Sequence, residues 1–182
     1  MADTYDLSKL FETQKVLEER IVKEHELEGC NLLPYKFLAL HVELGELANE
    51  QRTWKFWSKD QEPRIAVPKV EWSDGIPNQI IKNPLLEEYV DCLHFILDIG
   101  LELKANVNYQ FRAEKYPEIV TQFNRLYREL GSLWDYGRLA RYYWVVEMFI
   151  GLGELIGFTW DEIEQAYYAK NKINHERQES GY

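Results

Sequence analysis

The segment from Pro84 to about Lys104 constrains the fold most, because apolar residues cover nearly every side of the helix it would form. A helix that is apolar all round is usually buried in the core of a protein. Pro84 suits the first turn of such a helix, where its missing N–H would have no helical partner. The sequence therefore predicts a buried helix whose apolar residues are Leu85, Leu86, Tyr89, Val90, Leu93, Phe95, Ile96, Leu97 and Ile99.

Two acids interrupt this helix. Glu88 and Asp91 are three residues apart and share one face with Phe95. Burying ionised carboxylates is costly unless they are paired or hold a cation, so a positive group must lie against this face. An earlier pair, Glu43 and Glu46, has the same spacing beside an apolar stripe. For an isolated pair of this kind, the usual interpretation is a solvated face.

Three kinds of positive group could serve, and the residues leave all three open. Lysine or arginine would make a structural salt-bridge network. Iron in a ferritin-like bundle requires Glu-x-x-His on two helices, and here Asp91-x-x-His94 comes closest to that motif. Magnesium prefers hard oxygen ligands and often shares its shell with substrate phosphates. Four carboxylates on two facing helices fit magnesium best.

Further helices are predicted by the spacing of apolar residues, from Leu7 to about Lys23 and from Tyr35 to about Trp57. The aromatic-rich segment from Tyr116 to Leu155 predicts two more, broken near Gly131–Gly137. The last helix should begin at Thr159-Trp-Asp-Glu162, a capping box in which the hydroxyl and the carboxylate satisfy free amides at a helix start.

The connection between the second and third predicted helices, residues 58–84, contains four of the six prolines. A long connection of this kind tends to be functional or mobile. We find no stretch that alternates convincingly with a period of two residues. The sequence therefore predicts an all-α helical bundle, with residues 1–182 as a single domain and residues 104–143 as a candidate mobile sub-region.

Charge and composition exclude several classes of protein. The formal net charge of −10 argues against binding to a nucleic-acid polymer or a membrane surface, which needs a basic face. Two cysteines are too few for a disulfide framework, and the N-terminus lacks the basic and apolar regions of a signal peptide. No apolar run approaches the roughly 18 residues that span a bilayer. We therefore expect a cytoplasmic protein.

Positive side chains gather near the end of this acidic chain. Lys170, Asn174 and Arg177 follow one another at i, i+4 and i+7, which places these donors on one helix face. Such donors suit phosphate groups, although a basic face on a terminal helix is more often simply solvated. Lys55 lies in the aromatic cluster Trp54–Trp57, which could stack on a base but could equally be core.

Four blocks of this sequence together resemble a known family. They are "ETQKVLEERI", "ELGELANE" followed by "WKFW", "EEYVDCLHF", and "AYYAKNKINHERQESGY". In this order they are similar to the dimeric dUTPases of the all-α nucleoside triphosphate pyrophosphohydrolases. The blocks extend from about Phe11 to Tyr182, and Glu18 departs from the small polar residue found in some relatives.

The resemblance implies a Mg²⁺-dependent dUTP diphosphatase, a homodimer that converts dUTP, and often dUDP, to dUMP. It implies that Glu43 activates the attacking water. Four acids would bind the metal: Glu43, Glu46, Glu88 and Asp91. Substrate contacts would come from Gln14 (uracil), Phe95 (stacking on uracil), His94 (nucleoside), Lys170, Asn174, Arg177 and Tyr182 (phosphates), and Lys55, Phe56 and Trp57 (mouth of the site).

Two other functions stay open. One is a pyrophosphohydrolase of the same fold with another base preference, such as dCTP and dUTP, or a broader house-cleaning role. The other is a helical bundle that has lost catalysis and binds a partner protein. The second is disfavoured, because such a protein has no reason to keep all four acids together with Lys170, Asn174 and Arg177.

Overall fold

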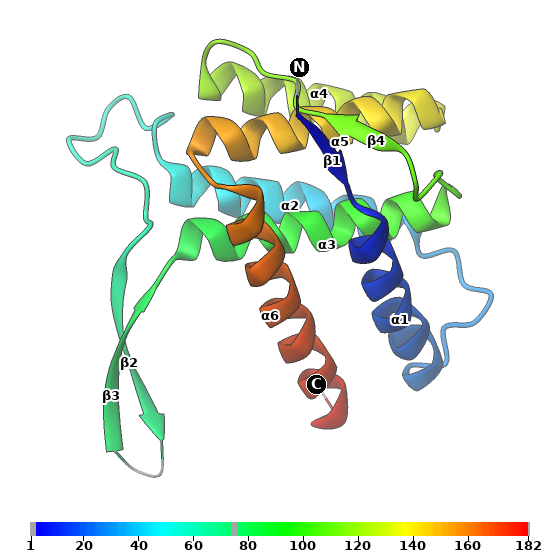
Figure 1. The fold of residues 1–182 in the computed structure, drawn as a ribbon, viewed down its shortest axis with the longest axis horizontal. Helices are drawn as coiled ribbons and strands as arrows, with labels where there is room; N and C mark the ends of the chain where they lie inside the picture. Colours follow the sequence, from blue (N-terminus) through cyan, green and yellow to red (C-terminus); the bar gives the residue numbers. More distant parts are fainter. Residues whose placement is uncertain (1–2, 74–75, 182) are drawn as a thin grey trace.

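A computed structural model describes residues 3–73 and 76–181 of the chain. These residues form a helical bundle with two short antiparallel strand pairs, which confirms the predicted all-α class (Figure 1). The helices in the described residues are α1 (Ser8–Glu24), α2 (Leu33–Gln51), α3 (Pro84–Glu102), α4 (Ile119–Tyr136), α5 (Leu139–Ile156) and α6 (Trp160–Glu179).

Helix α3 is the centre of the core, as its apolar character predicts. It runs beside α2 and also packs against α1, α5 and α6 (Figure 1). Helices α1 and α6 lie together on one side of the α2–α3 pair, and α4 and α5 lie together on the other. The buried residues of α3 include Tyr89, which stacks on Phe149 of α5 with ring centroids 4.3 Å apart.

Most helix boundaries follow the local sequence signals. Asn83 caps α3 by accepting a hydrogen bond from the Leu86 amide, and Pro84 takes the first turn. The capping box of α6 forms between Thr159 and Glu162. Helix α4 ends at Tyr136, and Gly137 after it has a positive φ of 56°, the left-handed conformation that commonly closes a helix. The predicted break between α4 and α5 is therefore confirmed there.

The predicted end of α2 at Trp57 is wrong. The helix ends at Gln51, because Arg52 adopts a left-handed φ of 73° and donates its backbone N–H to the Ala48 carbonyl oxygen. The guanidinium group of Arg52 then donates to the backbone carbonyl and the carboxylate of Asp60. These bonds stabilise a sharp turn that apolar spacing could not reveal.

The connection between α2 and α3 contains a β-ribbon that we did not predict. Strand β2 (Val67–Ser73) pairs antiparallel with β3 (Ile76–Lys82), and the ribbon extends away from the helices (Figure 1). Proline is tolerated here because both strands of a two-stranded ribbon are edges, where a missing N–H costs little. Pro68 and Pro77 are the reason that the sequence did not predict strands here.

A second strand pair ties the N-terminus to the segment after α3. Strand β1 (Thr4–Asp6) pairs antiparallel with β4 (Gln110–Arg112). Tyr5 of β1 also donates a hydrogen bond to Glu154 and packs edge-on against Trp160. The mobility of residues 104–143 stays a prediction. In the described part of the chain, no helix combines the length and apolar character that crossing a membrane requires.

Candidate functional site

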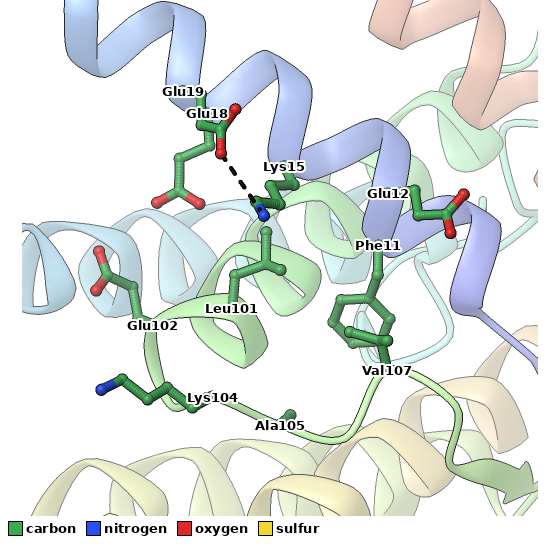
Figure 2. A pocket seen from close by; sticks show the side chains of 10 residues that line it. All are labelled: Phe11, Glu12, Lys15, Glu18, Glu19, Leu101, Glu102, Lys104, Ala105 and Val107. Carbon is green, nitrogen blue, oxygen red and sulfur yellow. Dashed lines mark ion pairs between the residues drawn. The ribbon is translucent and has the colours of Figure 1, made fainter.

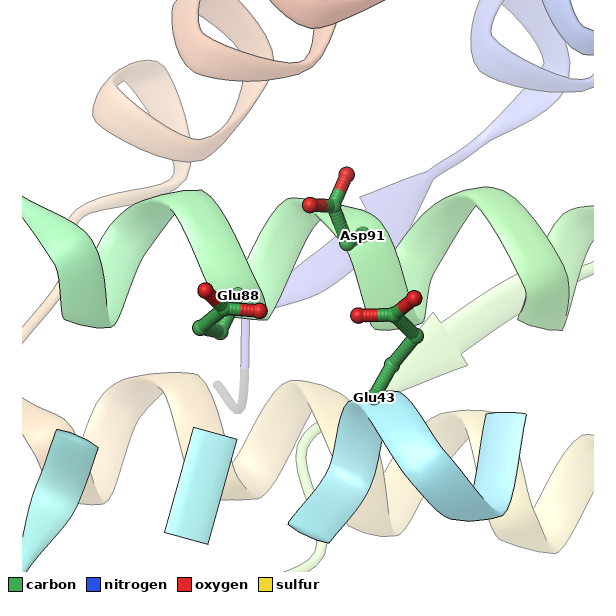
Figure 3. A group of neighbouring side chains, drawn as sticks. All are labelled: Glu43, Glu88 and Asp91. Atoms are coloured by element: carbon green, nitrogen blue, oxygen red, sulfur yellow. The ribbon is translucent and has the colours of Figure 1, made fainter. Parts of the chain in front are cut away.

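Three carboxylates from two helices converge between α2 and α3. Glu43 extends from α2 toward Glu88 and Asp91 of α3 (Figure 3). One oxygen from each of the three lies within 4.8 Å of the others, and all three side chains are partly buried. The i, i+3 spacing on α3 aims Glu88 and Asp91 at the same face, and α2 brings Glu43 across to meet them.

The three acids repel one another. Burial and the negative charges of Asp91, Glu46 and Glu43 raise the pKa of Glu88 to about 7. Burial, followed by Asp91 and Glu46, also raises the pKa of Glu43. Carboxylates crowded in this way favour a bound cation, which relieves the repulsion.

One positive side chain already lies beside this group. Lys170 of α6 is 2.5 Å from Asp91, measured from Nζ to Oδ2. The salt bridge that the sequence left open is therefore present, but it balances one charge of three. With all three acids ionised, the remaining charge is −3 + 1 = −2. This excess suits a divalent cation with hard oxygen ligands.

Glu46, the fourth predicted metal ligand, lies one turn further along α2 and is exposed. It is outside the group of three, although it raises the pKa of both Glu43 and Glu88 through its charge. Its role in binding metal stays a prediction.

Beside the carboxylates is a cavity of about 190 Å³ between α1, α3 and α6. It brings together eight of the predicted site residues, from four different helices. Among its lining residues are Gln14, Glu43, Asp91, His94, Phe95, Lys170, Asn174 and Arg177, and the remainder are Leu17, Ile21 and Asp98.

A hydrogen-bond network forms one wall of this cavity. The side-chain oxygen of Gln14 accepts from Tyr167 at 2.7 Å and lies 2.7 Å from Nδ1 of His94. The amide nitrogen of Gln14 donates to Asp98 at 2.8 Å. Tyr167 also stacks on the His94 ring, with centroids 4.2 Å apart, which fixes the plane of the imidazole.

His94 is neutral in this environment. Burial, assisted by the charge of Lys170, lowers its pKa to about 3. The Gln14 oxygen can only accept a hydrogen bond, so Nδ1 of His94 carries the proton. The other ring nitrogen, Nε2, is then an acceptor, and within the described residues it is buried without a hydrogen-bond partner.

A family model described as dUTPase matches residues 6–77 and 72–182 of the chain. The chain belongs to the dUTPase family. The resemblance noted in the sequence is thereby confirmed, and the protein is a dUTP diphosphatase, an enzyme that hydrolyses dUTP. A comparison with curated proteins gives no match.

Two members of the cavity network, Asp98 and Tyr167, were not predicted from the sequence. A signal for Asp98 existed, because Asp91, His94 and Asp98 follow at i, i+3 and i+7 and so share a face of α3. Burial raises the pKa of Asp98 to about 7, against the lowering effects of Lys36 and of the Gln14 hydrogen bond. Tyr167 has the same i, i+3, i+7 spacing with Lys170 and Asn174 on α6, although a tyrosine on such a face is more often an ordinary core residue.

Three predicted substrate residues do not line this cavity, and a fourth cannot be placed. Lys55, Phe56 and Trp57 lie in the turns after α2, where Phe56 is 84% exposed and Lys55 donates to Asn49 at 2.6 Å. Tyr182 lies outside the described residues. The roles of these four in the dUTPase stay predictions.

A larger cavity of about 560 Å³ lies between α1 and the end of α3 (Figure 2). Its charged residues are of both signs, and Lys15 forms an ion pair with Glu19 at 3.7 Å. Glu18 and Glu102, which also line it, hold the buried Lys36. The converging carboxylates Glu43, Glu88 and Asp91 do not line this larger cavity, so the smaller one is the candidate site.

Proposed function

We propose that this enzyme hydrolyses dUTP and dUDP to dUMP in a Mg²⁺-dependent reaction at the site between α1, α2, α3 and α6. The observation that supports it is the position of Glu43 and Asp91. They belong to the group of three carboxylates and also line the cavity that contains Gln14, His94 and Phe95. A metal-bound phosphate chain and a base could therefore occupy adjoining parts of one site.

Glu43, Glu88 and Asp91 would hold the metal, with Glu46 as a further ligand. Each of them offers carboxylate oxygens, the ligand type that Mg²⁺ prefers, and their mutual repulsion favours a cation. Mg²⁺ bound there would neutralise the phosphate chain, orient it and acidify a bound water.

Glu43 is our candidate for the general base that takes the proton of the attacking water. The family resemblance implies this role. In the metal-free protein, burial, followed by the charges of Asp91 and Glu46, raises the pKa of Glu43. Glu43 extends from α2 toward the two acids of α3 (Figure 3).

The uracil base would lie against Phe95, with Gln14 and His94 beside it. Thymine would have to be excluded sterically, since its extra methyl group neither donates nor accepts a hydrogen bond. Lys170, Asn174 and Arg177 of α6 would contact the phosphates. For Lys170 this means leaving, or sharing, its ion pair with Asp91. We retain Tyr182, Lys55, Phe56 and Trp57 as contacts at the mouth of the site on the strength of the family resemblance.

The test is pyrophosphate release from dUTP, dCTP and dTTP, and phosphate release from dUDP, each with Mg²⁺ and with EDTA. We expect hydrolysis of dUTP and dUDP in Mg²⁺ and none in EDTA. Equal hydrolysis of dCTP would favour the broader pyrophosphohydrolase. Absence of hydrolysis with every nucleotide would favour the partner-binding bundle.

We also propose a homodimer in the cytoplasm. An exposed apolar stripe on α2, formed by Tyr35, Leu38 and Val42, follows i, i+3, i+7 spacing and offers a surface to bury. The two free cysteines suit a reducing compartment. Sedimentation should give twice the chain mass of 21.7 kDa at micromolar concentration, and a monomer there would contradict the dimer.

A further inference from the structure

In the hydrogen-bond network of the cavity wall, a single carboxylate determines which groups donate and which accept. Three of its four members can each bond in two ways. The Gln14 amide can rotate by half a turn, the His94 ring can carry its proton on either nitrogen, and the Tyr167 hydroxyl can donate or accept. Ionised Asp98 can only accept. Its contact at 2.8 Å therefore requires the nitrogen, not the oxygen, of the Gln14 amide.

Asp98 determines the tautomer of His94 through two hydrogen bonds, both made by Gln14. With its nitrogen toward Asp98, Gln14 turns its oxygen toward His94 and Tyr167. That oxygen needs donors, so Nδ1 of His94 is protonated and Nε2 carries a bare lone pair. Nε2 is buried in a residue that lines the cavity and is 6% exposed, and no described residue bonds to it. A buried acceptor left without a donor is costly, which implies a donor from a ligand.

We propose that Asp98 is a positioning residue for base selection, which holds His94 in the tautomer whose Nε2 accepts the N3–H of uracil. The inference rests on the proposed function, in which a pyrimidine lies beside His94. Uracil carries a proton at N3, whereas cytosine carries a lone pair there. A cytosine base in the same position would set two acceptors against each other, and a site that leaves such groups unpaired rejects the wrong base strongly.

The reverse arrangement shows why Asp98 decides the outcome. If the Gln14 amide turned over, its oxygen would face the carboxylate and its nitrogen would donate to Nδ1 of His94. Nε2 would then carry the proton and would suit N3 of cytosine. Asp98→Asn permits both arrangements, because an amide at position 98 can accept or donate while keeping nearly the same shape.

The first measurement uses the wild-type protein and needs no substrate. Nitrogen NMR of histidine-labelled protein, with His94 assigned by comparison with His94→Gln, distinguishes the two tautomers. The spectra are recorded at pH 8.5, above the pKa of about 7 that burial gives Asp98. We expect a protonated Nδ1 and an unprotonated Nε2. A protonated Nε2, or a cationic ring, would overturn the proposal whether or not the protein hydrolyses any nucleotide.

The second measurement compares kcat/KM for dUTP and dCTP in Asp98→Asn. We expect the preference for dUTP to fall by at least about tenfold, with a mixture of His94 tautomers in the spectrum. The matched control is Glu102→Gln, which removes one negative charge beside Lys36 but does not contact Gln14. It should leave both the tautomer and the preference unchanged.

An unchanged preference in Asp98→Asn would refute the role in selection, as would an equal loss in Glu102→Gln. If the wild-type enzyme hydrolyses no deoxynucleotide, the proposed function fails, while the tautomer measurement still tests the network. If Asp98→Asn does not fold, the wild-type spectrum remains the deciding result.

Discussion

Replacing Glu88 by glutamine should stabilise the metal-free protein at alkaline pH. The folded protein binds the Glu88 proton more tightly than the unfolded chain, because its pKa is raised from 4.5 to about 7. An acid of this kind lowers stability as the pH rises from 4.5 through 7, and the loss is complete above that range. Glutamine keeps the shape of the side chain and removes the charge.

The magnitude follows from the two pKa values. One pKa unit corresponds to about 1.4 kcal/mol, so the full difference is about 3 kcal/mol. Glu88 is only partly buried, and solvent screening reduces the effect to about 1–2 kcal/mol. For a chain of this length, that corresponds to a rise in Tm of about 2–8 °C.

The assay is thermal unfolding in EDTA at pH 8.5 and at pH 5. Glu88→Gln should unfold at a higher temperature than wild type at pH 8.5, and at nearly the same temperature at pH 5. Glu87→Gln, a change at the exposed neighbouring acid, is the control and should shift unfolding by less than about 0.5 kcal/mol at either pH. Adding Mg²⁺ should stabilise wild type more than the variant, because ligand binding stabilises the folded state. An equal shift at both pH values, or destabilisation at pH 8.5, would refute the reasoning.

Two further predictions concern the proposed base and the packing of α5. Glu43→Gln should lower turnover at saturating dUTP by about 10²–10⁴-fold while calorimetry shows a non-hydrolysable analogue still binding, and near wild-type turnover would remove Glu43 from the base role. Gly151→Ala should destabilise the protein by about 1–3 kcal/mol in urea unfolding, because its Cβ would lie 2.0 Å from the Glu114 carbonyl oxygen. Gly131→Ala, in an open position on α4, should instead be neutral or stabilise by up to about 1 kcal/mol, and similar losses in both variants would contradict this assignment.

Helices could be predicted from this sequence where one local signal decided the outcome. The apolar character of α3 predicted its burial, and the capping box predicted the start of α6. The end of α2 could not be predicted, since it depends on hydrogen bonds from Arg52 to Asp60 that form only after the chain has turned. The β-ribbon was missed because proline is a poor strand former in general but is tolerated at an edge.

The candidate site, like the fold, could be predicted from the sequence only in part. Spacing predicted that Glu88 and Asp91 share a face, and the equal spacing of Glu43 and Glu46 suggested partners from a second helix before the resemblance gave Glu43 a role. The network around Gln14 depends on α1, α3 and α6 meeting in space, so the spacing of Tyr167 with Lys170 and Asn174 could not reveal its contact with Gln14. Lys170 was predicted to meet phosphate, and its contact with Asp91 depends on the same packing of α6 against α3.

Helix α3 is the core helix and also carries four residues of the candidate site and its network: Glu88, Asp91, His94 and Asp98. This combination limits how the enzyme can evolve. Substitutions on α3 that alter the site also act on a helix packed against α1, α2, α5 and α6. Helices α1 and α6 meet the cavity from the periphery and can change with less disturbance to their surroundings. Laboratory selection for a new base should therefore accept mutations first at the partly exposed Ile21, and only later, after stabilising changes elsewhere, on α3.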